Sequence, residues 1–230
     1  MIHIEQLHLK AGTFSLSNVT LSVPDGTYAV LMGETGSGKT TLIEAVCGLR
    51  PIVSGRITVG GQRVDHIDPA LRGIGYVPQD GALFSSMTVR EQIGLPLRVR
   101  RLARRDVQRR VEAMADLLGI TELLSRMPAR LSGGERQRVA LARAVVFEPG
   151  VVCLDEPFSA LDEPAREAMY ETIDHLREKT GLTALHVTHN SSEATRLGDT
   201  LFRLEHGSIV RANKQTNKSA NDRTKQQSNE

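Results

Sequence analysis

The chain has 230 residues, of which 40% are apolar and 24% are charged, the composition of an ordinary soluble globular protein. Its formal net charge is +2, but residues 211–230 hold five Lys/Arg against two Asp/Glu, so the rest of the chain is close to −1. This balance argues against a nucleic-acid-binding body, which usually needs a large basic surface. No apolar run reaches the roughly 18 residues of a membrane span, and residues 1–5 do not have the pattern of a signal peptide.

The first third of the chain predicts antiparallel strands. Apolar and polar residues alternate over residues 2–9, with one slip, which predicts a half-buried edge strand, and they alternate again over residues 14–23. Residues 24–26 form a Pro-Asp-Gly turn. Two short β-branched runs flank Gly60 and Gly61, which predicts a hairpin.

A phosphate-binding loop interrupts these strands. The apolar run of residues 28–32 predicts a buried strand, residues 40–49 predict a helix, and Gly-x4-Gly-Lys-Thr lies between them. Glycine lets backbone N–H groups face phosphates, and the helix N-terminus favours an anion. Lys39 is expected to reach the β- and γ-phosphates and Thr40 to ligate Mg²⁺. The nucleotide-binding candidates are Gly33, Glu34, Thr35, Gly36, Ser37, Gly38, Lys39, Thr40 and Thr41.

An inserted α-helical subdomain is expected at about residues 81–149. It follows a strand at residues 74–77, and residues 104–118 have a helical apolar period. Seven arginines lie between Arg98 and Arg110. They are interpreted as a solvated helix face, with contact to anionic lipid headgroups as the alternative. Ser132 and Glu135 have the spacing of a capping box, which begins a helix through residue 146.

Two carboxylates follow the buried strand predicted at residues 150–154. Asp155 is expected to hold Mg²⁺, mostly through water, and Glu156 to take a proton from the attacking water. A proline-initiated helix over residues 164–180, a strand over 184–187, a helix capped by Asn190, and a hairpin over 201–210 complete an alternating α/β pattern.

Four further residues fall in polar positions near strand ends. Gln79 follows a strand and could reach Mg²⁺ or the attacking water, and His189 follows another and could donate to the γ-phosphate. Asp162 follows the carboxylates in a tight loop. His186 is interpreted as a core histidine. Cys47 and Cys153 lie in apolar segments and are expected to be buried thiols.

Over residues 2–210 the chain resembles the ATP-binding cassette (ABC) family. The resemblance rests on the phosphate loop, Gln79, the Leu-Ser-Gly-Gly-Glu stretch, Asp155 with Glu156, the Ser-Ala-Leu-Asp stretch ending at Asp162, and His189. It implies a P-loop NTPase core with an antiparallel β subdomain and an inserted α-helical subdomain. The ATPase domain would span residues 1–211, and residues 212–230 read as a disordered polar tail.

The resemblance also implies the site and its partners. ATP and Mg²⁺ would be the cofactors, and a second copy, or a similar ATPase, would cap the ATP in a head-to-tail dimer through Ser132, Gly133, Gly134 and Glu135. The Ser132 hydroxyl would have to choose between capping its helix and binding phosphate. An aromatic residue usually stacks on adenine in this family. Phe14 is the candidate, with Ala11 at the equivalent place as an alternative, and a plain core role for Phe14 is equally compatible.

Residues 157–162 resemble importer subunits. Transmembrane permease subunits and a solute-binding protein would then be partners, and the chain would sit peripherally on the cytoplasmic face of the inner or plasma membrane. Similarity around Phe14, Glu34 and Thr35 favours a molybdate/tungstate-type importer, with thiamine, sulfate and polyamine importers close behind. An exporter or lipoprotein-extraction ATPase is the alternative, and a cassette protein acting on DNA or ribosomes is the least favoured.

Overall fold

A computed structural model describes residues 1–205 and 207–212, so residues 213–230 of the predicted polar tail lie outside the described residues. The chain forms two compact units. Among the described residues, one contains residues 1–67, 183–205 and 207–212, and the other contains residues 68–182. The second unit includes the whole of the predicted helical insert and extends beyond it on both sides. Within the described ranges, no helix is both long enough and apolar enough to cross a membrane.

The first unit contains a four-stranded antiparallel sheet. Its strand order is β2 (Phe14–Val23), β1 (Ile2–Ala11), β4 (Ser54–Val59) and β5 (Gln62–Arg63). The expectation that β1 is an edge strand was wrong, because β1 pairs with β2 on one side and with β4 on the other. The predicted slip is real: Gln6 has a φ of +44°, and the register shifts between Ile4 and Leu7.

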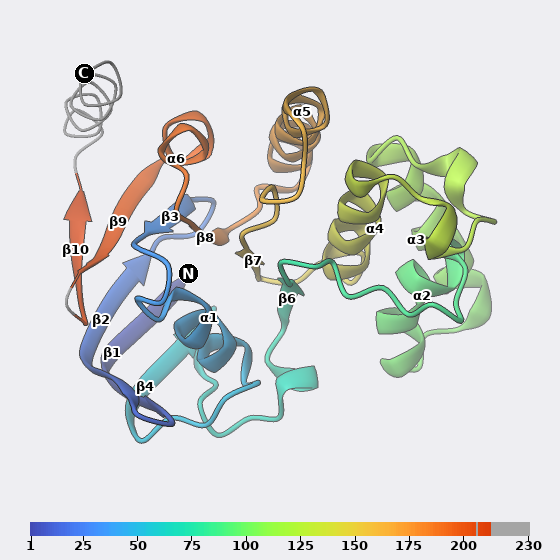
Figure 1. Ribbon diagram of the computed structural model, residues 1–230. Helices are drawn as coiled ribbons and strands as arrows, with labels where there is room; N and C mark the ends of the chain where they lie inside the picture. Colours follow the sequence, from blue (N-terminus) through green and yellow to red (C-terminus); the bar gives the residue numbers. More distant parts are fainter. Residues whose placement is uncertain (206, 213–230) are drawn as a thin grey trace, which may run out of the picture. The chain divides into compact units, whose positions relative to one another are not determined.

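The same unit carries a group of mostly parallel strands. β3 (Tyr28–Met32) pairs in parallel with β8 (Ala184–Thr188) and β9 (Thr200–Glu205), and β10 (Ser208–Ala212) pairs antiparallel with β9 (Figure 1). Every residue of β3 and β8 is buried, as expected for strands covered on both faces. Helix α1 (Lys39–Cys47) contacts β8, and α6 (Ser191–Leu197) contacts β3.

The second unit is mainly helical. Its two strands, β6 (Ile74–Val77) and β7 (Val151–Asp155), pair in parallel. Helix α2 begins with a capping box formed by Thr88 and Glu91. Gly75 in β6 faces the Ala144 carbonyl of α4, where a larger residue would collide with that helix. The helices are α2 (Val89–Val99), α3 (Arg104–Leu117), α4 (Gly133–Val145) and α5 (Glu163–Thr180), and 3-10 turns cover Pro69–Leu71, Thr121–Leu123 and Pro128–Arg130.

Candidate functional site

The phosphate loop has the backbone shape that its glycines predict. Gly36 and Gly38 have φ values of +82° and +99°, which side-chain-bearing residues rarely adopt. Helix α1 starts at Lys39 with Gly38 as its N-cap, and no side chain caps it. Its first N–H groups therefore face a position where an anion can accept their hydrogen bonds.

Two side chains of the loop are set for a polar ligand. The Lys39 Nζ donates to the carbonyls of Gly33 (2.8 Å) and Glu34 (2.9 Å), and the residue is 5% exposed. The Ser37 hydroxyl is buried, and it has no hydrogen-bond partner among the described residues. Buried polar groups are nearly always bonded, so an unpartnered hydroxyl beside a lysine fits a site for phosphate oxygens.

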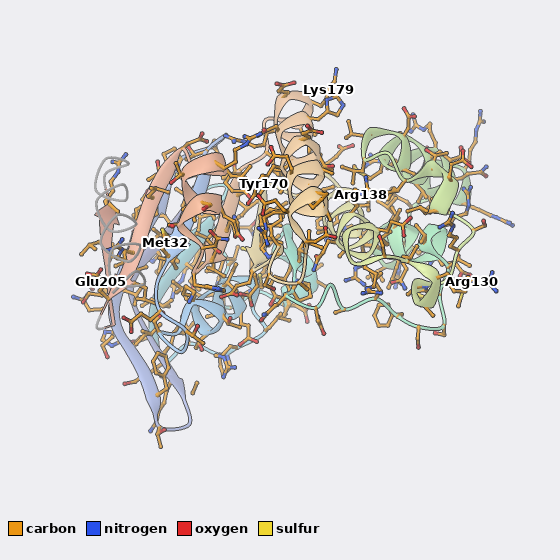
Figure 2. All side chains as sticks on the ribbon, turned by 45° about the horizontal axis from the view of Figure 1, so that its top comes forward. Met32, Arg130, Arg138, Tyr170, Lys179 and Glu205 are labelled. Carbon is orange, nitrogen blue, oxygen red and sulfur yellow. The ribbon has the colours of Figure 1, made fainter. Side chains whose placement is uncertain are left out.

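His189 shares a pocket with this loop. The pocket has a volume of about 520 Å³. Met32 and Glu205, at the ends of β3 and β9, are labelled in Figure 2. The structure thus brings the predicted His189 beside the phosphate loop. The pocket is lined by Met32, Gly33, Glu34, Ser37, His189 and Arg203–Glu205.

Phe14 packs on the phosphate loop. A Cβ placed on Gly38 would lie 2.5 Å from the Phe14 Cζ and 2.7 Å from its Cε1, so the ring covers the Gly38 Cα. Phe14 is half-buried and pairs with Ala11 at the end of the β1–β2 hairpin. This position is adjacent to the nucleotide candidates rather than deep in the core, and adenine stacking by Phe14 stays a prediction.

The two predicted carboxylates lie at the carboxyl end of β7. Asp155 is 3% exposed, and its Oδ2 lies 3.5 Å from the Tyr76 hydroxyl, at the outer limit of a hydrogen bond. Glu156 is half-buried and has a φ of +43°, a strained value for a residue with a side chain. The Glu156 carbonyl accepts hydrogen bonds from the backbone N–H and the hydroxyl of Ser159, which stabilise this turn.

Gln79 lies beside the same strand end, because β6 pairs with β7. Its Nε2 is 3.5 Å from the Ser159 hydroxyl, and its carbonyl accepts from the Gln137 Nε2 at 3.0 Å. The structure therefore brings Gln79 to the edge that carries Asp155 and Glu156. Asp162 has a defined structural role: its Oδ1 accepts from the Ala165 N–H at 3.0 Å and caps α5.

A side chain of helix α4 forms hydrogen bonds with the segment that follows Gln79. Arg143 donates to the carbonyls of Gly81 (2.9 Å) and Ala82 (2.8 Å), and Ala82 has a φ of +39°. Burial lowers the pKa of the Arg143 guanidinium from its ordinary value. The sequence analysis did not identify Arg143 or Gln137. The available signal was a Gln and an Arg within a helix whose other inward positions are Val, Leu and Ala.

The Ser132 capping box is present. The Ser132 Oγ accepts from the Glu135 N–H at 3.2 Å, and the Ser132 N–H donates to the Glu135 Oε2 at 2.7 Å. That backbone N–H is the main reason why the pKa of Glu135 is below its ordinary value. In the cap the hydroxyl oxygen accepts through a lone pair. The expected choice between capping and phosphate binding stays a prediction.

Close packing keeps the N-terminal turn of α4 beside α5. A Cβ on Gly134 would lie 3.3 Å from the Ala165 Cβ, tighter than ordinary contact. Gly133 is less constrained, with Leu161 Cδ2 at 3.5 Å from the equivalent point. The glycines thus place the backbone N–H groups of this turn close to the residues that follow Asp162.

The predicted magnesium ligands have suitable chemistry. Thr40 offers a hydroxyl, Gln79 an amide oxygen and Asp155 a carboxylate, and all three are the hard oxygen donors that Mg²⁺ prefers. Thr40 is the second residue of α1 in the first unit, and the other two belong to the β6–β7 edge of the second. These donors fit the metal that accompanies a nucleoside triphosphate.

A Gly-rich loop with a buried lysine, followed by a helix and combined with strand-end carboxylates, defines a P-loop nucleotide-binding protein. Residues 16–159 match the family described as ABC transporter, and the chain belongs to that family. The predicted family is confirmed, and the chain contains an ATP-binding cassette.

The chain is similar to curated proteins that are named import ATP-binding proteins. The molybdate/tungstate import ATP-binding protein WtpC of Thermococcus kodakarensis is 42% identical over 197 residues, which cover 86% of this chain and 60% of that protein. The sn-glycerol-3-phosphate import ATP-binding protein UgpC of Ruegeria pomeroyi is 41% identical over 194 residues, covering 84% and 55%. The chain spans about three fifths of the length of the curated relatives it matches.

A solved structure supports the fold. The dimeric post-hydrolysis state of the ATP-binding cassette MJ0796, bound to ADP and Pi, aligns with a TM-score of 0.80 at 27% identity. The alignment covers 92% of this chain and 97% of that chain. The predicted ABC-type fold, with its antiparallel sheet, parallel strands and helical region, is confirmed.

Proposed function

We propose that the chain binds and hydrolyses ATP to energise the import of a small anionic solute. The observation that carries the proposal is the phosphate-loop pocket, where the unpartnered Ser37 hydroxyl and His189 line one cavity with Gly33, whose carbonyl accepts from Lys39, in a member of the ABC transporter family. The same chain supplies Glu156, a half-buried carboxylate at a strand end.

Each site residue has a role in hydrolysis. Lys39 and the loop N–H groups bind and orient the phosphates, and Thr40, Gln79 and Asp155 would hold Mg²⁺, which neutralises phosphate charge when bound. Glu156 accepts the proton of the attacking water. His189 donates to the γ-phosphate. As Glu156 takes the proton, the water oxygen bonds to the γ-phosphorus, the bond from that phosphorus to the β–γ bridging oxygen breaks, and ADP and phosphate are the products.

A second cassette completes the site. The Ser132 hydroxyl proton and the N–H groups of the glycines that follow can donate to the γ-phosphate held by another copy, at the positive end of the α4 dipole. The similarity to a dimeric cassette bound to ADP and Pi supports this arrangement. We infer a head-to-tail dimer of this chain or of this chain with a similar ATPase.

The chemistry of the solute is inferred from the relatives. The names of the similar proteins specify molybdate/tungstate, sn-glycerol-3-phosphate and sulfate/thiosulfate, which all carry anionic oxygens. Molybdate or tungstate is our first candidate. Import would require transmembrane permease subunits and a solute-binding protein, with this chain peripheral on the cytoplasmic face of the membrane.

Two substitutions test the ATPase proposal. Glu156→Gln keeps ATP binding, slows turnover by about 10²–10⁴-fold, as loss of a general base does, and traps an ATP-bound dimer. Lys39→Ala removes nucleotide binding. Glu171→Gln is the matched control, because it removes an exposed carboxylate of α5 and leaves turnover unchanged. Unchanged turnover in Glu156→Gln would exclude Glu156 as the base.

The transport proposal needs the native partners. We would isolate the tagged chain from its own cells in mild detergent and identify the bound proteins by mass spectrometry. A multi-span permease with a solute-binding protein supports import, and that binding protein would then be titrated with molybdate, tungstate, sulfate and glycerol phosphate. A permease with a large extracytoplasmic domain and no binding protein would favour the exporter alternative.

A further inference from the structure

A buried chain of polar side chains lies behind the turn that carries His189. Tyr28 of β3, His186 and Thr188 of β8, and Glu193 of α6 are 0%, 0%, 2% and 3% exposed. They lie among apolar side chains, where an uncompensated polar or charged group is costly. Packing alone would be satisfied by apolar residues at these positions, so the polar set calls for another explanation.

The donor and the acceptor of the hydrogen bonds among these buried side chains can be assigned. The Thr188 Oγ1 lies 2.7 Å from the Glu193 Oε2, and because a carboxylate only accepts, the threonine donates. The same Thr188 oxygen accepts from the backbone N–H of Asn190 at 3.0 Å. Glu193 therefore orients the hydroxyl, and the hydroxyl fixes the backbone two residues further along the chain.

His186 and Tyr28 lie on the other side of the carboxylate. The His186 Nε2 is 3.4 Å from the Glu193 Oε2, a contact whose geometry does not make a hydrogen bond, and the Tyr28 hydroxyl is 3.2 Å from the His186 Nδ1. The tyrosine can donate to Nδ1 in the tautomer that carries its proton on Nε2. The edge-to-face packing of the two rings, with centroids 5.8 Å apart, fixes the imidazole plane.

His189 lies between Thr188 and Asn190, which are joined by the hydrogen bond from the Asn190 N–H to the Thr188 hydroxyl. Thr188 precedes it, and Asn190 follows it and caps α6 by accepting from the Ser192 N–H at 2.8 Å. His189 itself lines the pocket beside Gly33 and Ser37. Hydrogen bonds thus fix the backbone on both sides of His189. On the Thr188 side, they connect it to the buried carboxylate of Glu193.

We propose that Glu193 and Thr188 are positioning residues that set His189 against the phosphates in the loop pocket. The inference rests on the proposed ATPase function and deepens it. Neither residue lines the loop pocket. They act by fixing the backbone around the group that does, so that the imidazole meets the γ-phosphate without searching other orientations.

Thr188→Val is the direct test. Valine keeps the shape of threonine but can neither donate to Glu193 nor accept from Asn190. The expected result is a kcat for MgATP lowered by about 10- to 100-fold, with the Kd for ATP within about twofold of the native value. Thr188→Ser restores the hydroxyl and should recover most of the turnover.

Thr183→Val is the matched control. Thr183 lies just before the same strand, is 4% exposed, and its hydroxyl accepts from the Gly26 N–H at 3.0 Å. The control also removes a buried threonine hydroxyl that accepts a backbone hydrogen bond, but far from His189. Its melting temperature should fall, while its kcat stays native.

Non-additivity separates positioning from a general structural effect. In a His189→Ala background, Thr188→Val should lower kcat no further, because the group that it positions is gone. A further loss as large as in the native background would overturn the proposal, as would native kcat in Thr188→Val. Should Thr188→Val fail to fold, Glu193→Met, which has a similar length but cannot accept from the Thr188 hydroxyl, provides the same comparison and the same criteria.

The outcomes also distinguish this inference from the proposed function. If the native chain does not hydrolyse ATP, or Glu156→Gln leaves hydrolysis intact, the proposed mechanism fails first. If the native chain is active, Glu156→Gln is inactive, and Thr188→Val (or Glu193→Met in its place) turns over normally, the positioning inference alone fails.

Discussion

Replacing Gly38 with alanine tests the contact between Phe14 and the phosphate loop. The substitution has two costs. An L-residue in the left-handed region costs about 1–2 kcal/mol, and forcing a methyl group into packed atoms costs about 1–3 kcal/mol more. The second cost arises because the new Cβ would lie 2.5 Å from the Phe14 ring. We therefore expect the free energy of unfolding to fall by about 2–5 kcal/mol.

Gly36→Ala isolates the first cost. Gly36 also has a positive φ, +82°, but nothing lies within 4 Å of the position of its Cβ. Its expected loss is about 1–2 kcal/mol. The difference between the two variants therefore measures the collision with the ring, free of the shared backbone term.

The assay is urea unfolding of the nucleotide-free chain, repeated in a Phe14→Ala background. If the ring causes the extra cost, the two alanine variants become nearly equal once the ring is removed, and the coupling energy in the double-mutant cycle is about 1–3 kcal/mol. Equal losses in the native background, or an excess that survives Phe14→Ala, would refute the reasoning.

Two further predictions concern helix α4. Arg143→Met removes both charged hydrogen bonds to the carbonyls of Gly81 and Ala82, and the free energy of unfolding should fall by about 2–4 kcal/mol in urea titrations; a loss below about 0.5 kcal/mol would contradict the role of Arg143. Glu135 has a pKa lowered by the Ser132 N–H, so its stabilisation is present above the unfolded-state pKa and is lost as pH falls through the folded-state pKa. The stability difference between the native chain and Glu135→Gln should therefore shrink as urea titrations move from pH 7 to pH 3, and a constant difference would show that the carboxylate charge has no part in the cap.

The sequence predicted the features that are encoded locally. The phosphate loop, the two carboxylates and the Ser132 capping box each occupy a few consecutive residues, so spacing alone reveals them. Helix α2 was missed because Gly94 and Pro96 interrupt its apolar period, although its capping box was available as a signal.

Features that depend on distant residues were not predicted. The position of β1 inside its sheet depends on pairing with β4, more than 40 residues away, which apolar alternation does not encode. The bond from Arg143 to Ala82 joins residues 61 positions apart. His186 was correctly expected in the core, but its link to Glu193 requires the helix that follows the strand to fold back over it.

The left-handed backbone of Glu156 is a position where the residue that gives the highest stability differs from the residue that the proposed activity needs. Glycine or asparagine would adopt the φ of +43° more easily than glutamate, so either should raise the melting temperature while removing the carboxylate. Under the proposed role of Glu156 as the base, a screen that selects only for thermal resistance would therefore enrich inactive chains at this position. Engineering a more robust cassette has to hold residue 156 fixed and look for added stability elsewhere, for example where Ala82 has a similar strained backbone.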